Sequence, residues 1–284
     1  MTMQQQISDQ QKVWATELSG KFDFDKYGYV FKLEDNLFLP LSGESEAEYR
    51  HAQGDELGSD GKRGKMKALH SSSALVVNFF LYWRKNDRLN EIAKACGISD
   101  GMTKMQFEQI FPTGLEGNSP EPDILFTGAG LKPVAVESKF TEPYQKHTVR
   151  KIKDKYFESL NLWAGLPKCE SLARLIKQEE QGKTSFTYLD APQLIKHILG
   201  LTKTFGKLQF ELLYLWYELS STEAEEHKKQ LTEFKEYIKG EVHFRDITYH
   251  HVFENIRKYP NVDSYYLSYL NERYFNSSGD YKKS

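Results

Sequence analysis

Residues 120–139 read PEPDILFTGAGLKPVAVESK and are the most informative segment of this chain. It contains two short apolar runs, residues 123–127 and 134–140, joined by the glycine-containing turn GAGLKP. Apolar runs of this length on either side of a glycine turn predict an antiparallel β-hairpin. If the hairpin folds about Gly130, Asp123 and Glu137 are equally far from the turn, so they lie opposite each other.

Asp123, Glu137 and Lys139 form the candidate catalytic site of this hairpin. Directly opposed residues on antiparallel strands have Cβ atoms about 4.5–5.5 Å apart, which lets two carboxylates share one ion. Side chains alternate along a strand, so Glu137 and Lys139 lie on one face and Ser138 on the other. Phosphodiester hydrolysis needs a hard cation held by carboxylate oxygens and a positive group that stabilises the developing charge. These three side chains supply both requirements.

The spacing of Glu137 and Lys139 is weak evidence by itself. An acidic residue two positions before a lysine also occurs at residues 60–62, 226–228, 233–235 and 280–282. Of these five triplets, only Glu137-Ser138-Lys139 ends an apolar strand that has an aspartate opposite it. The alternative is a surface hairpin whose glutamate and lysine lie on the solvent-exposed face and have no catalytic role.

Composition excludes several classes of protein. The chain has 284 residues, of which 39% are hydrophobic and 27% charged, a balance typical of soluble globular proteins and not of disordered or membrane chains. No apolar run reaches the roughly 20 residues that span a bilayer, and the start MTMQQQISDQQ lacks the order of a secretory signal. We therefore expect a cytoplasmic protein without membrane contacts. Cys96 and Cys169 give neither a disulfide framework nor zinc-type spacing.

Charge limits how the chain can bind nucleic acid. The formal net charge is −2, so any such binding must come from local basic patches and not from the whole surface. One patch lies at residues 62–67. The second lies on a helix predicted over residues 145–163, whose apolar residues recur at spacings of three and four. Its basic residues are either nucleic-acid contacts or a solvated helix face: Lys146, Arg150, Lys151 and Lys153.

The remaining pattern predicts an α/β fold in one domain. Residues 1–12 are polar and predict a flexible tail, and the glycine-rich residues 54–64 predict a loop. Helices are expected over residues 65–84, 88–96, 170–181, 192–204 and 222–239, with two more at the end, and strands at residues 105–111, 208–219 and 242–247. Strands between long helices predict a sandwich with a central mixed sheet. The single domain covers residues 13–284, with a core at 65–219 and extra C-terminal helices at 220–284.

Pro122-Asp123 followed by Glu137-Ser138-Lys139 resembles the signature of the PD-(D/E)XK nuclease superfamily. The predicted order of helix, three strands, helix and strand in residues 65–219 is similar to the restriction-endonuclease-like core of that superfamily. The segments LHSSSALVVNFF, VAVESKFTEPY and ITYHHVFENI, residues 69–80, 134–144 and 247–256, resemble a bacterial group of predicted restriction endonucleases. The resemblance implies that Asp123 and Glu137 bind Mg²⁺, with Mn²⁺ as a substitute, while Lys139 positions or activates the attacking water.

The chain departs from this pattern in its third acidic ligand. Many members carry a further acid on the first core helix, but residues 65–84 contain no Asp or Glu. Glu108, Glu116 and Glu121 are the candidates to replace it. His70 is a candidate contact to the scissile phosphate, and a histidine bonded to local backbone is the alternative. Gln193, together with Lys196 and His197 on the same predicted helix, faces either the active site or solvent.

The leading functional hypothesis is a Mg²⁺-dependent endonuclease that cleaves DNA in restriction or defence. A repair or recombination nuclease acting on branched or single-stranded nucleic acid is the second. A nucleic-acid-binding module that keeps the fold without cleavage is the third, since a fold does not guarantee one function. Endonucleases of this kind often act as dimers, so a homodimer is left open.

Overall fold

A mixed five-stranded sheet forms the centre of the protein. The computed structural model describes residues 2–18, 22–59, 61–147, 152–158, 161–179 and 186–275. The strands are β1 (Lys104–Phe107), β2 (Ile124–Thr127), β3 (Val134–Lys139), β4 (Glu211–Trp216) and β5 (His243–Thr248), in the order β1-β2-β3-β4-β5. The pairs β1–β2 and β2–β3 are antiparallel, while β3–β4 and β4–β5 are parallel. The expected mixed sheet is confirmed.

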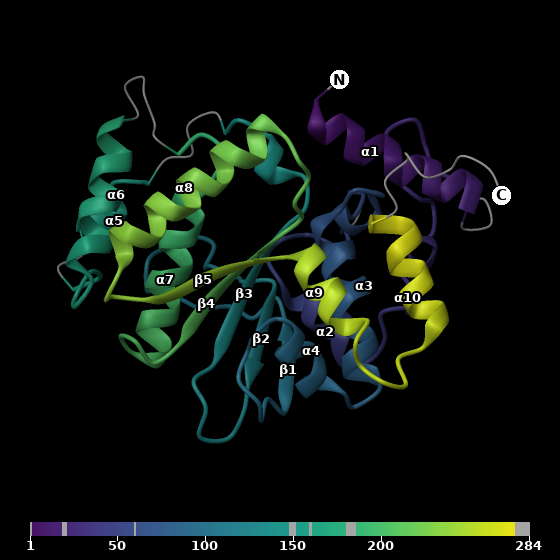
Figure 1. Cartoon of the computed structure of the whole chain (residues 1–284). Helices are drawn as coiled ribbons and strands as arrows, with labels where there is room; N and C mark the ends of the chain where they lie inside the picture. Colours follow the sequence, from purple (N-terminus) through teal and green to yellow (C-terminus); the bar gives the residue numbers. More distant parts are fainter. Residues whose placement is uncertain are drawn as a thin grey trace.

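Helices cover the sheet on both sides (Figure 1). One group comes from the middle of the chain: α5 (Lys155–Glu158), α6 (Pro167–Glu179), α7 (Ala191–Phe205) and α8 (Thr222–Ile238). The other group joins both ends of the chain: α1 (Met3–Val13), α2 (Glu44–His51), α3 (Ser72–Lys85), α4 (Leu89–Ala95), α9 (Tyr249–Ile256) and α10 (Ser264–Leu270). The arrangement is an α/β sandwich of the restriction-endonuclease-like kind. Among the described residues, none of the helices combines the length and the apolar character needed to cross a membrane.

The predicted hairpin and its register are confirmed. Ile124 pairs with Val136 and Leu125 with Ala135, which continues the register that places Asp123 opposite Glu137. Every residue of β3 is buried, because β2 and β4 flank it in the sheet and helices cover both faces. Neighbouring strands and helices thereby hold its polar end, which carries Glu137 and Lys139, in a fixed position.

The helix predicted over residues 65–84 begins later than expected. Residues Lys65–Lys67 form a short 3-10 turn, and α3 starts at Ser72. The Ser71 side chain accepts a hydrogen bond from the Ala74 N–H at 3.2 Å, so it caps the first turn. Met66 and Leu69 are buried without belonging to the helix, and this burial explains why the apolar pattern extended too far.

The prediction of a flexible tail over residues 1–12 is wrong. Residues Met3–Val13 form α1, which begins at the N-cap Thr2. Ile7 and Gln11 are buried, and the Gln11 side-chain amide donates to the Arg273 carbonyl oxygen at 2.8 Å. The polar composition suggested a solvent-exposed segment. Gln11 is nevertheless buried, because Arg273, far along the chain, accepts its hydrogen bond.

The helix predicted over residues 145–163 is also wrong. Residues 145–147 are not helical, and α5 spans only Lys155–Glu158. Residues 148–151 and 159–160 lie outside the described residues. Strand β1 is shorter than predicted, because Glu108 has a φ of 48°, a left-handed conformation that ends the strand. The predicted helices near α4, α6, α7 and α8, the strand β5 and the two closing helices are confirmed.

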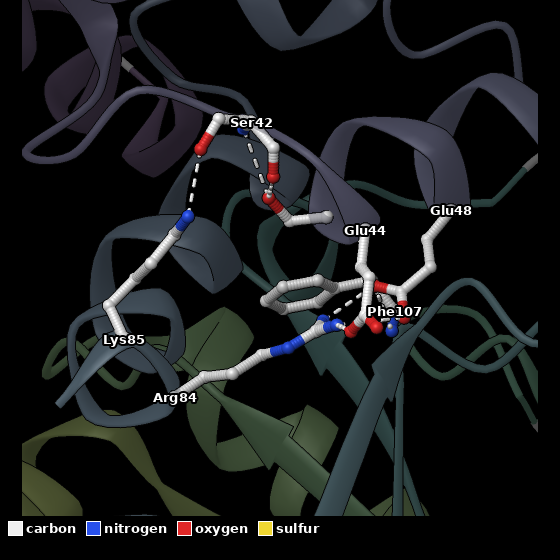
Figure 2. Close-up of polar contacts among 7 residues, drawn as sticks. Ser42, Glu44, Glu48, Arg84, Lys85 and Phe107 are labelled. Carbon is white, nitrogen blue, oxygen red and sulfur yellow. Dashed lines mark hydrogen bonds and ion pairs between the residues drawn. The ribbon is translucent and has the colours of Figure 1, made fainter. Parts of the chain in front are cut away.

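A half-buried ion pair joins helix α2 to helix α3. Figure 2 shows Arg84 of α3 reaching Glu44 and Glu48 of α2, with N–O distances of 2.8 and 2.6 Å. A Glu48 carboxylate oxygen also accepts the Phe107 N–H at 3.3 Å, which ties α2 to β1. These contacts fix the point from which the loop after α2 leaves for the edge of the sheet.

Candidate active site

The three predicted residues meet at one end of the β2–β3 hairpin. The Lys139 Nζ donates to Glu137 Oε1 at 2.6 Å, so both side chains lie on the same face of β3. The Ser138 N–H donates to Asp123 Oδ2 at 2.7 Å, which holds the aspartate against the same strand. The Ser138 hydroxyl lies 2.7 Å from the Tyr249 hydroxyl of α9, on the opposite face. The predicted alternation of side chains is confirmed.

These residues line a cavity of about 430 Å³. Acidic side chains from four segments line it: Glu56, Glu108, Glu121, Asp123, Glu137 and Glu142. The first turn of α3 contributes Ser72 and Ser73, and α7 contributes Gln193, Lys196 and His197. The cavity therefore concentrates carboxyl groups at the polar end of the hairpin.

Glu137 is the charged centre of the site. Its Oε2 lies 2.9 Å from His197 Nε2, and its Oε1 accepts from Lys139. Burial by itself raises the pKa of Glu137, but Lys139 and His197 outweigh burial and hold the pKa at about 2. Glu137 is thus a carboxylate at neutral pH although it is only 2% exposed.

Asp123 and Glu108 have the opposite electrostatic character. Burial raises the pKa of Asp123 well above its ordinary value, and the negative charge of Glu137 raises it further, against the opposing effects of Lys139 and the Ser138 N–H. Burial and the charge of Asp123 likewise raise the pKa of Glu108. Too little positive charge faces these two carboxyl groups, and a bound divalent cation would supply it.

Lys139 is held in the site from two sides. The Gln193 side-chain oxygen accepts from its Nζ at 2.9 Å, opposite the bond to Glu137. Burial lowers the pKa of Lys139, but Glu137, Glu142 and Asp123 outweigh burial and raise it above its ordinary value. The lysine is therefore an oriented cation beside the acidic cluster.

The site offers carboxylate oxygens, which are the ligands that Mg²⁺ prefers in proteins. Among the described residues, no group of three or more His, Cys, Asp and Glu side chains is placed to hold a metal by itself. Mg²⁺ does not need such a cage, because it keeps several waters and binds through one or two carboxylates together with substrate phosphates. Asp123 and Glu137 on adjacent strands supply such a pair of carboxylates.

The structure brings some of the other predicted residues to the cavity and not others. Glu108, Glu121 and Gln193 line it. Glu116 is exposed and His70 is half-buried, and neither of them lines the cavity. Lys146 and Lys153 are exposed and also lie outside its lining, while Arg150 and Lys151 lie outside the described residues.

Glu56 also lines the cavity, although the sequence did not predict it there. It follows α2 in the predicted glycine-rich loop, and its carboxylate accepts from the Ser73 hydroxyl at the start of α3. No local sequence pattern predicts its position. The loop that carries Glu56 reaches the cavity because Arg84 holds the preceding helix α2 in place. The pairing of His197 with Glu137 left a weak signal, since Gln193 and His197 are four residues apart and share one face of α7.

Comparison with known proteins identifies the family of the chain. No curated protein and no solved structure matches the chain. A family model described as restriction endonuclease associating with ARP matches residues 8–275, which include every residue that lines the cavity. The chain therefore belongs to this restriction-endonuclease family.

Proposed function

We propose that the protein is a Mg²⁺-dependent endonuclease that hydrolyses DNA phosphodiester bonds, with Asp123 and Glu137 as metal ligands and Lys139 as the catalytic cation. The observation that carries this proposal is geometric: the Lys139 Nζ donates to Glu137 Oε1 at 2.6 Å, and the Ser138 N–H between them donates to Asp123 Oδ2 at 2.7 Å. Two carboxylates that repel each other in a buried cavity are stabilised by a shared divalent cation. Membership of a restriction-endonuclease family supports nucleic acid as the substrate.

Each side chain that lines this cavity has a separate role in the proposed hydrolysis. When bound, Mg²⁺ supplies charge neutralisation at the phosphate and lowers the pKa of the attacking water. Lys139 orients that water and stabilises the negative charge that develops on the phosphoryl oxygens. Gln193 holds the Lys139 Nζ at 2.9 Å and so fixes the direction of its positive charge. His197 keeps Glu137 ionised and in place from the other side.

Glu108 and Glu56 are the candidates for an additional acidic ligand. Both line the cavity, and Glu108 lies directly after β1, where its backbone N–H donates to the Asp123 carbonyl oxygen at 3.1 Å. Its left-handed backbone is a costly conformation of the kind that clusters at functional sites. Glu108 is therefore the better candidate for an additional metal ligand, since the same backbone hydrogen bond fixes it next to Asp123.

Cleavage of plasmid and linear DNA tests the proposal. Wild-type protein should nick or linearise DNA with Mg²⁺ or Mn²⁺ and lose this activity in chelator. Glu137→Gln should reduce cleavage by at least about 100-fold, the scale of losing one group that stabilises transition-state charge. Glu116→Gln is the matched control, because Glu116 is exposed and does not line the cavity.

Two outcomes would remove this proposal. Equal cleavage by Glu137→Gln and Glu116→Gln would show that the acidic cavity is not the active site. Wild-type protein that binds DNA but cleaves neither DNA nor RNA with any divalent ion would favour a non-catalytic binding module.

A further inference from the structure

A second cavity, of about 400 Å³, has an apolar floor and a charged rim. Leucine side chains form the floor: Leu33, Leu37, Leu41 and Leu57. Phe31, Lys32 and Lys67 stand on the rim with Glu34, and Glu46 and Arg50 form an ion pair there at 2.7 Å. Such a cavity suits a flat ligand with an apolar face, polar edges and a negatively charged attachment.

The rim carries an exposed aromatic side chain in a basic setting. Phe31 is 64% exposed and Tyr27, on the same segment, is 62% exposed. Residues 26–32 lie against residues 62–67, since the Val30 N–H donates to the Lys67 carbonyl oxygen at 3.0 Å. These two segments contain six basic side chains, of which Arg63 pairs with Asp25 and Lys65 with Glu56. Aromatic rings among basic side chains are typical of surfaces that bind single-stranded nucleic acid.

The second cavity lies next to the active-site cavity. Glu56 lines the first cavity and the following residue, Leu57, lines the second. Lys65 lies 3.3 Å from Glu56, and Lys67 of the same 3-10 turn lines the second cavity. One strand of nucleic acid that crosses this shared loop would meet both cavities.

We propose that the second cavity binds an unpaired nucleobase of the strand whose phosphodiester occupies the active-site cavity. This inference rests on the proposed function. The base stacks on Phe31 above the leucine floor, and the Glu34 carboxylate accepts from an amino group on its edge. Lys32 and neighbouring lysines contact the adjacent phosphates, which makes binding weaken with salt. The site therefore favours substrates with a base that is single-stranded or easily unpaired.

Binding of a labelled single-stranded oligonucleotide in EDTA tests the inference without cleavage. Phe31→Ala should raise the Kd about tenfold, the scale of losing one stacked base. Phe31→Tyr should bind within about twofold of wild type, because it keeps a ring for stacking. Tyr265→Ala is the matched control, since Tyr265 is 72% exposed on α10 and lines neither cavity.

A second arm identifies the base. Oligonucleotides that each lack one base should show a position at which the loss weakens binding to wild type but not to Phe31→Ala. Equal Kd values for Phe31→Ala and Tyr265→Ala would overturn the inference, as would the absence of any sensitive position. If wild type cleaves plasmid DNA but binds no single-stranded oligonucleotide, or if these two variants bind alike, only this inference fails. If wild type cleaves no DNA at all, the proposed function fails with it.

Discussion

At the scale of single residues, the site is a balance of buried charges that the sequence specifies in part. Asp123, Glu137 and Lys139 were predictable because strand alternation and hairpin register are local rules, and the observed pairing of Ile124 with Val136 follows them. Glu56 was not predictable, since its position depends on contacts with residues distant in sequence. The pairing of Glu137 with His197 across the cavity likewise depends on how α7 packs.

Lys139→Met should separate catalysis from metal binding. The substitution removes the Nζ that occupies Glu137 Oε1, so the carboxylate oxygen becomes available to a cation. Cleavage should fall by about 100- to 1,000-fold, as for other groups that stabilise transition-state charge. Mg²⁺ affinity, measured by titration calorimetry, should stay the same or become tighter. A large loss of Mg²⁺ affinity would instead make Lys139 part of the structure of the metal site.

Asp123→Asn should stabilise the metal-free protein at neutral pH. Because folding raises the pKa of this carboxyl, the folded state disfavours its charged form, and stability falls as the pH rises through the raised pKa. Asparagine removes that penalty and still offers an oxygen to the Ser138 N–H. Thermal unfolding in EDTA should give a higher Tm for Asp123→Asn than for wild type at pH 8, with a smaller difference at pH 4.

Added Mg²⁺ provides the control for this prediction. It should raise the Tm of wild type but not that of Asp123→Asn, because the variant lacks one of the two proposed ligands. A variant that is less stable than wild type at pH 8 in EDTA would mean that Asp123 is not strained in the metal-free site.

At the scale of elements, the long periodic helices and the buried strands were predictable, and the connections between them were not. Helices α7 and α8 agree with their apolar periodicity, whereas the described residues 145–147 and 152–154 before α5 have a helical pattern without a helix. Helix α2 was not predicted at all, since it is short and polar. Contacts with Arg84 and with the Phe107 backbone hold it in place (Figure 2).

Glu48→Gln should weaken this anchor of α2. Glu48 and Arg84 have side chains only 16% and 15% exposed, so removing the charge leaves a half-buried guanidinium with weaker partners. The free energy of unfolding, measured in urea, should fall by about 1–3 kcal/mol. On the same helix, Glu46→Gln should change it by less than about 1 kcal/mol, because the Glu46–Arg50 pair is exposed to solvent. Equal effects of the two substitutions would show that α2 is not anchored through Glu48.

At the scale of the whole molecule, α1 near the start of the chain is hydrogen-bonded to residues near its end, on one side of the sheet. Arg273 is fully buried and donates to Gln11 Oε1 at 3.0 Å and to the Asn36 carbonyl oxygen at 2.8 Å. The α/β class and the sheet were predictable from periodicity and from the resemblance. The joining of the ends was not, because it depends on hydrogen bonds between residues 262 positions apart.

Gln11→Leu should destabilise the whole fold. The substitution leaves one buried Arg273 N–H without its acceptor and the Arg273 carbonyl oxygen without its donor. We expect a loss of about 1–3 kcal/mol in the free energy of unfolding, measured in urea. Gln6→Leu, on the exposed face of α1, is the control and should stay within about 0.5 kcal/mol. An unchanged free energy of unfolding for Gln11→Leu would show that the Gln11–Arg273 hydrogen bonds do not stabilise the fold.

Crystals soaked in Mn²⁺ would reveal the metal site itself, because anomalous scattering locates the ion. The proposed site predicts an anomalous peak in contact with carboxylate oxygens of both Asp123 and Glu137 in wild type, and no peak there in Glu137→Gln. A wild-type peak elsewhere on the protein, or one that stays between these strands in Glu137→Gln, would contradict the proposed metal site.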